Sequence, residues 1–104
     1  MTEQELSRLR EICIQLRKTI QKYGEKYYLS QIKALYDIVQ CIDADMDEKE
    51  KTKYILDRYR VLYPPHGGLS EFYIQDDDFA TRLKLNEPLD ALKEDLWKII
   101  KSYI

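Results

Sequence analysis

Apolar side chains recur along this chain at steps of three and four residues, the spacing that places them on one face of an α-helix. The clearest row predicts a first helix and consists of Leu6, Leu9, Cys13, Leu16, Ile20 and Tyr23. Thr2 and Glu5 have capping-box spacing before the row, and Gly24 follows it, where a left-handed residue commonly ends a helix. A chain built this way is expected to fold by packing helices together.

Two more rows follow in the first two thirds of the chain. A second helix is expected from about Glu25 to Ile42, antiparallel to the first, with an apolar face of Tyr28, Ile32, Leu35, Tyr36, Val39 and Ile42. The cap-like pair Asp47 and Glu50 predicts the start of a third helix, which ends before Pro64 because the residue before a proline avoids the helical conformation. Its inward side chains are expected to be Tyr54, Ile55, Tyr59 and Leu62.

Residues 64–78 break the helical pattern. The run Pro64-Pro65-His66-Gly67-Gly68 predicts a turn, and Glu71–Ile74 has the aromatic and β-branched composition of a short extended segment. Since no second strand is expected, this segment either packs as irregular backbone or offers an edge to a partner. Asp76–Asp78 favour a helix start, and Phe79–Leu85 would form that short helix.

The last helix is marked by Asn86-Glu87-Pro88, a plausible cap followed by a first-turn proline. Its row is Leu89, Leu92, Leu96, Ile99 and Tyr103, widened by Trp97 and Ile100. With only three Gly and three Pro in 104 residues, the chain has few of the tight turns that a β-sandwich needs. We therefore expect one all-α domain over residues 1–104, with four main helices, room for a short fifth and one irregular loop at about 64–78.

Composition and charge narrow the class of function. The formal net charge of −2 argues against a dedicated nucleic-acid binder. The first residues have neither the basic nor the apolar part of a secretory signal, and no apolar run reaches the roughly 18–20 residues that span a bilayer. We expect a cytoplasmic protein with no membrane partner. Cys13 and Cys41 are too few for a disulfide framework and are expected to be small buried hydrophobic residues.

Neither acidic cluster has the pattern of a metal site. Asp43, Asp45 and Asp47 begin like an EF-hand loop, but its sixth and twelfth positions are Glu48 and Tyr54 instead of Gly and Glu. A second cluster comprises Asp76, Asp77 and Asp78, whose consecutive side chains diverge. We expect helix capping from both clusters and no metal or cofactor.

His66, the only histidine, is the first residue to consider if the chain is a small hydrolase or a nucleotide-acting enzyme. Ser70 lies four residues on and acids follow, but nothing resembles a nucleophile elbow. The pair Gly67-Gly68 also lacks the spacing and the Lys-Ser/Thr of a phosphate-binding loop. A structural turn is the preferred interpretation, and no catalytic residue is assigned.

Residues 49–63 combine basic and aromatic side chains, as in sites that neutralise phosphates and stack bases. The set comprises Lys49, Lys51, Lys53, Arg58, Arg60, Tyr54, Tyr59 and Tyr63. Glu48, Glu50 and Asp57 dilute it, so weak nucleic-acid binding is an alternative and a solvated mixed-charge helix is preferred.

Tyrosine is over-represented, with nine residues in 104. Core filling accounts for most of them, but tyrosine is also favoured in protein interfaces because it is large, rigid and amphipathic. We predict a recognition patch formed by Tyr63, His66, Phe72 and Tyr73, in or beside the irregular loop.

The last 40 residues or so carry His66-Gly67-Gly68-Leu69-Ser70-Glu71-Phe72-Tyr73-Ile74, Asn86-Glu87-Pro88-Leu89-Asp90-Ala91-Leu92 and Leu96-Trp97. This arrangement resembles a group of small, uncharacterised bacterial helical proteins. The resemblance implies a bacterial source and an all-helical domain, and some proteins of this kind are toxin-neutralising immunity proteins. We expect a non-enzymatic protein-binding module, immunity-like or regulatory, whose partner is another protein; a homodimer is also compatible with the wide apolar rows.

Overall fold

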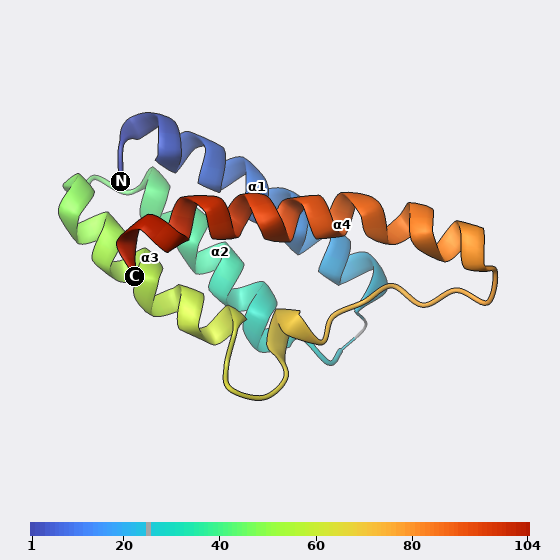
Figure 1. The fold of residues 1–104 in the computed structure, drawn as a ribbon. Coiled ribbons are helices and arrows are strands. Elements are labelled where there is room, and N and C mark those ends of the chain that lie inside the picture. Colours follow the sequence, from blue (N-terminus) through green and yellow to red (C-terminus); the bar gives the residue numbers. More distant parts are fainter. Residues whose placement is uncertain (25) are drawn as a thin grey trace.

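The computed structural model describes residues 1–24 and 26–104 and contains four α-helices. These are α1 (Glu3–Tyr23), α2 (Leu29–Asp43), α3 (Glu48–Leu62) and α4 (Phe79–Ile100), with short 3-10 helices at Gly68–Ser70 and Lys101–Tyr103 (Figure 1). No strand occurs in the part of the chain that the structure describes. The prediction of an all-α fold with four main helices is confirmed.

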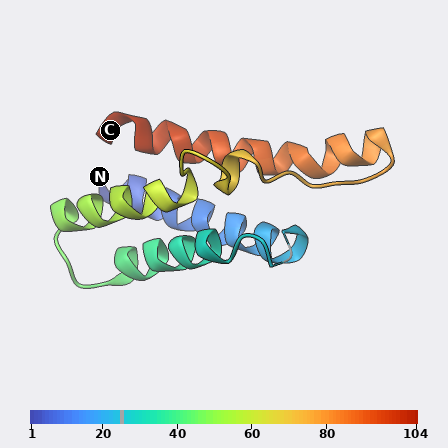
Figure 2. The same ribbon diagram turned by 90° about the horizontal axis from the view of Figure 1, so that it is seen from below.

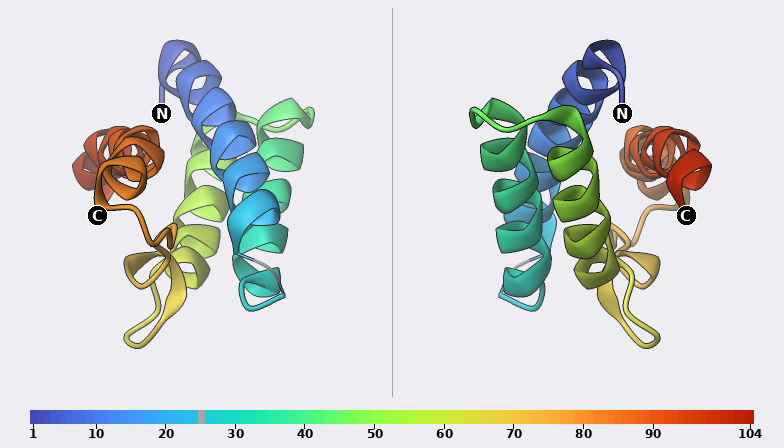
Figure 3. Two further views of the ribbon diagram at one scale, coloured as in Figure 1. Left: turned by 90° about the vertical axis from the view of Figure 1, so that its right-hand side faces the viewer. Right: turned by 90° about the vertical axis from the view of Figure 1, so that its left-hand side faces the viewer.

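Helix α1 lies at the centre of the arrangement. It packs against α2 on one side and against α4 on the other, while α3 packs against α2 (Figure 3). The molecule measures 47 × 24 × 22 Å, and the two termini lie at the same end. At the opposite end, the first turns of α4 project beyond the end of α1 (Figures 1 and 2).

Both ends of α1 follow from local chemistry, although one detail of the prediction is wrong. Thr2 Oγ1 accepts from the Glu5 backbone at 3.1 Å and Glu5 Oε1 accepts from the Thr2 backbone at 2.9 Å, which is the predicted capping box. Gly24 ends the helix in a right-handed conformation, with φ −88°, and not in the left-handed one. A side chain there would come within 2.9 Å of the Tyr28 ring, so close packing explains the glycine.

Helix α2 begins later than predicted and buries a wider face than the predicted row, most of which lies in or against the core. It starts at Leu29, after a turn, and the predicted start at Glu25 lies outside the described residues. Tyr36, predicted inward, is 46% exposed with the Arg17 guanidinium over its ring. Because α2 lies between α1 and α3, two adjacent faces are covered, and its buried residues are Gln31, Ala34, Leu35, Ile38, Val39 and Cys41.

Helix α3 is capped as predicted, because Asp47 Oδ1 accepts from the Glu50 backbone at 2.8 Å. Ile55 and Leu62 are fully buried, as expected. Tyr54, expected inward, is 39% exposed, because it lies on the side of α3 that lines a surface hollow with Met46. Two polar contacts attach α3 to α2: Gln31 Nε2 donates to the Val61 carbonyl and Lys51 Nζ donates to the Ile42 carbonyl.

The segment after α3 packs as irregular backbone, one of the two alternatives that its composition left open. Leu69, Phe72 and Ile74 are buried in the core. Gly68 has φ +69°, and a side chain on it would approach the Leu62 carbonyl oxygen to 2.5 Å. The tight return of the chain therefore requires glycine at this position. We call residues 71–78 the strap, because they run from this turn along α4.

Helix α4 is continuous, so the predicted break at residues 86–88 is wrong. Asp78 Oδ2 caps it by accepting from the Thr81 backbone and hydroxyl, at 2.9 and 2.7 Å. Asn86 is buried and does not cap: its Oδ1 accepts from the Ile74 N–H at 2.9 Å, and its Nδ2 donates to the Ile74 carbonyl at 2.8 Å. The asparagine therefore holds the strap, while exposed Pro88 lies inside the helix without ending it.

Candidate functional site

The four residues of the predicted recognition patch do not form one surface. Phe72 is only 3% exposed and packs edge-on against Tyr28, with ring centroids 5.1 Å apart. Its place in the core corrects the expectation that it contacts a partner: an apolar ring beside α4 is more stable when buried than in water. Tyr73 is 45% exposed on the strap, and His66 is exposed on the turn before it.

Tyr63 is half-buried and serves the packing at the end of α3. The centroids of the Tyr63 and Tyr59 rings lie 5.2 Å apart. Burial raises the pKa of the Tyr63 hydroxyl to about 12. Two members of the predicted set, Tyr63 and Phe72, therefore have structural roles. His66 and Tyr73 are the two exposed members of the set.

The structure does not bring His66 and Ser70 together as a catalytic pair. The Ser70 hydroxyl donates to the Gly67 carbonyl at 2.8 Å, within the turn itself. His66 has no side-chain hydrogen bond or ion pair with any residue that the structure describes, and it does not line the surface hollows described below. General acid–base chemistry needs a base oriented by a second group, which this geometry does not supply to His66.

Both cysteines are buried, and most members of the two acidic clusters have structural partners. Burial raises the pKa of the Cys13 thiol to about 12, and Cys41 lies within 3.9 Å of the Lys51 carbonyl. Asp43 pairs with the Arg10 guanidinium at 2.8 and 3.0 Å. Asp47 and Asp78 cap helices, as the sequence predicts for these clusters.

The outer side of α3 carries three adjoining hollows, and Lys53 lines each of them. The first, of about 410 Å³, is lined by Met46, Glu50, Lys53, Tyr54 and Asp57. The second, of about 550 Å³, is lined by Met1, Glu48, Lys49, Thr52, Lys53 and Leu56. The third, of about 230 Å³, is lined by Lys53, Leu56, Asp57 and Arg60. We call this surface the α3 face.

A line of positive charge runs along the middle of the α3 face. Lys49, Lys53 and Arg60 follow one another at helical spacing, so they share one side of α3, and all three are exposed. None of them forms an ion pair with a residue in the described part of the chain. Their charges are therefore free to meet acidic groups of another molecule.

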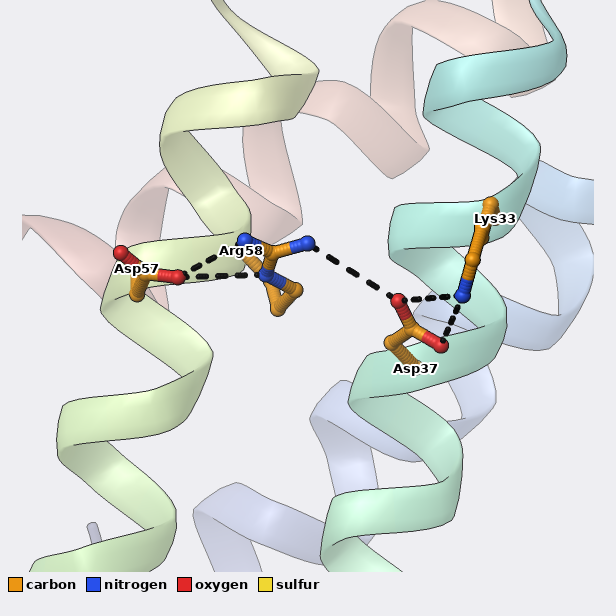
Figure 4. Close-up of polar contacts among 4 residues, drawn as sticks. All are labelled: Lys33, Asp37, Asp57 and Arg58. Carbon is orange, nitrogen blue, oxygen red and sulfur yellow. Dashed lines mark hydrogen bonds and ion pairs between the residues drawn. The ribbon is translucent and has the colours of Figure 1, made fainter.

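The neighbouring Arg58 shows how a basic residue is neutralised within the fold. It pairs with Asp57 at 2.8 Å and lies 3.9 Å from Asp37 on α2, which in turn accepts from Lys33 at 3.1 Å (Figure 4). This chain of charges ties α3 to α2. Arg58 and the carbonyl-bound Lys51 thus belong to the structure, and the line of charge on the α3 face consists of Lys49, Lys53 and Arg60.

Apolar and aromatic groups accompany this line. Met46 and Tyr54 are partly exposed beside Lys53, and half-buried Leu56 lines both the second and the third hollow. Aromatic residues, methionine and arginine are enriched where proteins contact one another. The sequence had marked Lys49, Lys53, Tyr54 and Arg60 as a mixed basic–aromatic set, but it gave no reason to include Met46 or Leu56. Only the structure shows that Met46 and Leu56 belong to the α3 face, because they line the same hollows as Lys53.

No family model matches the chain, and neither a curated protein nor a solved structure shows significant similarity to it. Among the described residues, no helix is long and apolar enough to cross a membrane. Fold and surface together define a four-helix protein whose α3 face combines basic, acidic and apolar side chains.

Proposed function

We propose that this chain is a non-enzymatic protein-binding module whose α3 face holds an acidic, partly apolar segment of another protein. The observation that carries the proposal is the line Lys49, Lys53 and Arg60, which is free of ion pairs with described residues and runs through the three hollows. Carboxylates on a partner would neutralise the line, and apolar side chains would fill the hollows beside Tyr54 and Met46.

A protein partner suits this face better than single-stranded nucleic acid. Base stacking needs free aromatic faces, whereas Tyr59 and Tyr63 are half-buried and pack against each other. Glu50 and Asp57 line the first hollow and would repel phosphates and carboxylates alike, so an apolar side chain of a protein partner suits that hollow best.

The bacterial source and the immunity-like or regulatory role stay predictions from the sequence. Toxin neutralisation would be one form of the binding proposed here, with an acidic segment of the toxin on the α3 face. Exposed His66 and Tyr73 would then be peripheral contacts, because they lie on the turn and the strap rather than on α3.

Three charge or surface variants test the assignment by affinity capture and by titration of the captured protein. The first is Lys49→Glu, Lys53→Glu and Arg60→Glu on the α3 face. The second is a matched control with the same change in charge, Lys18→Glu, Lys22→Glu and Lys26→Glu, at exposed positions near and after the end of α1. The third is His66→Ala with Tyr73→Ala, which removes the exposed part of the predicted loop patch.

We expect the α3 variant to lose binding by at least about tenfold, and the control and loop variants to retain it within about twofold. Wild-type binding should weaken with added salt, because exposed charges are screened. Loss in the loop variant alone would move the binding surface to the strap. Tight, steeply salt-dependent binding of a mixed-sequence oligonucleotide, abolished by the α3 variant, would replace the protein partner by nucleic acid.

A further inference from the structure

The projecting start of α4 exposes an apolar pair. Phe79 and Leu83 are 64% and 56% exposed and lie one turn apart, so they share one side of the helix. The Arg82 guanidinium lies 5.3 Å from the Phe79 ring centre and donates to the Asp76 carbonyl at 3.0 Å. The start of α4 is therefore an ordered surface that holds its large apolar side chains in water.

Acidic residues immediately precede this pair. Asp78 caps the helix and Asp76 Oδ1 accepts from the Asp78 backbone at 2.9 Å. Asp77 is exposed and forms no ion pair or side-chain hydrogen bond with a described residue. Residues 76–83 thus combine carboxylates with two exposed apolar side chains, which is the chemistry that the α3 face is proposed to hold.

We infer that a second copy of this chain is a partner of the α3 face, and that the start of α4 of one copy docks on the α3 face of the other. The inference rests on the proposed function of that face. Asp76 and Asp77 would meet Lys49 and Lys53. The apolar pair of α4 would contact Met46 and Tyr54 in the first hollow, which also contains Glu50 and Asp57. Opposite charges and uncovered apolar groups are present on both sides of the contact.

The shape of the molecule makes this contact intermolecular and reciprocal. The start of α4 lies at one end of the 47 Å long molecule and the start of α3 at the other (Figures 1 and 2). The two surfaces therefore do not meet within one chain. In the inferred dimer, two chains lying antiparallel about a two-fold axis would form the contact twice, which would double the buried area and close the assembly. Such a dimer covers the α3 face, so another partner would compete with the second copy.

Opposite charge reversals test the pairing on the full chain. We expect the wild-type chain to sediment as a dimer, and Lys53→Glu and Asp77→Lys each to weaken it by about tenfold or more, since each places like charges in both contacts. Mixing the two variants should restore a heterodimer, because one contact is then wild-type and the other has exchanged charges. Lys18→Glu, on the exposed side of α1, is the matched control and should leave the dimer unchanged.

A second variant tests the apolar part of the contact. Phe79→Ala with Leu83→Ala should weaken the dimer by at least about tenfold and leave the helical circular-dichroism signal unchanged, because both side chains are exposed in the single chain. A wild-type chain that stays monomeric up to millimolar concentration, or a dimer indifferent to Lys53→Glu, would overturn the inference. If the monomer still captures another protein through the α3 face, the self-pairing fails and the proposed function stands.

Discussion

The two longest helices, α1 and α4, have nearly the same length but differ in how many of their apolar side chains are buried. Helix α1 has 21 residues and buries an unbroken series comprising Leu6, Leu9, Ile12, Cys13, Leu16 and Ile20. Helix α4 has 22 residues, and apolar Phe79, Leu83 and Trp97 stay exposed on it. The difference comes from neighbours: α1 lies between α2 and α4, whereas α4 packs on α1 along only part of its length.

The comparison separates apolar residues that stabilise the fold from those that are available to partners. On α1 every turn contributes to the core. On α4 the middle and the C-terminal part do so, while the start is held by polar contacts to the strap. An exposed apolar side chain on an otherwise ordered helix is a candidate contact for another protein.

The largest effect is expected from truncating the α1 row. Leu16→Ala removes a fully buried side chain between two helices and should lower the free energy of unfolding by about 3 kcal/mol. Leu83→Ala on α4 makes the same chemical change at an exposed position and should cost less than about 0.5 kcal/mol. Urea denaturation at low protein concentration measures both. Equal losses would contradict the contrast between the two helices.

A smaller loss is expected when the strap is released from α4. Asn86→Ala leaves the buried N–H and carbonyl of Ile74 without their partner and should cost about 2 kcal/mol. The exchange rate of the Ile74 amide hydrogen should rise with it. Glu87→Ala, at the exposed neighbouring position, is the control and should change neither quantity. An unchanged Ile74 exchange rate would show that the strap is held by its apolar side chains alone.

Cys13 on α1 and Lys93 on α4 should change the free energy of unfolding in opposite directions as the pH becomes alkaline. Burial raises the pKa of Cys13 on α1 from 9 to about 12, so the folded chain retains a proton that the unfolded chain loses. The thiol's contribution to the free energy of unfolding is fully present below pH 9. It is lost towards pH 12, by about 1.4 kcal/mol for each pH unit. Cys13→Ala should remove that slope from the free energy of unfolding.

Lys93 on α4 provides the opposite case. Burial lowers the pKa of its ammonium group, which donates to the Phe72 carbonyl at 2.8 Å. The folded chain then binds fewer protons than the unfolded chain, so its contribution to stability rises with pH between the folded and unfolded pKa values. Lys93→Met should make the stability curve fall more steeply with pH than that of the wild type. A shift in the other direction would contradict the assigned cause.

The smallest effect is expected from the ion pair that joins the two helices. Arg8 on α1 and Asp95 on α4 lie 2.7 Å apart, but their side chains are 52% and 36% exposed to water. Arg8→Ala should therefore cost about 0.5 kcal/mol or less, and the difference should disappear at high salt. Thermal unfolding at low and high ionic strength provides the measurement. A loss that persists at high salt would indicate that the arginine stem packs between the helices.

Sequence reasoning was most successful where neighbours along the chain determine the structure. Thr2 with Glu5 and Asp47 with Glu50 predicted helix starts that the structure contains, because a cap involves only residues three positions apart. Asn86, two residues before a proline, also predicted a helix start but does not cap. Its amide pairs with Ile74, which lies twelve positions earlier, and no local pattern reveals that contact. The break predicted in α4 was wrong for this reason.

For the candidate site, too, the sequence predicted the local features and missed those that depend on tertiary contacts. The predicted patch was chosen for residue type, and Phe72 proved to be core, since an aromatic ring has the same sequence signature in a core and in an interface. Lys49, Lys53 and Arg60 could be found by their helical spacing. They line hollows that also contain acidic side chains but form no ion pair with a described residue. Arg58, in contrast, reaches Asp37, and that contact depends on how α2 and α3 lie together.

The sequence by itself determined that this chain forms amphipathic helices and where most of them begin, because hydrogen bonding within a helix and its cap is local. Tertiary structure alone decided which apolar residues are covered. Ile38 became core and Tyr36 surface on the same helix, and Phe79 was left exposed, because burial depends on where the neighbouring helices end. The packing of the helices also left Lys49, Lys53 and Arg60 without an ion pair to a described residue. The proposed binding depends on these three charges.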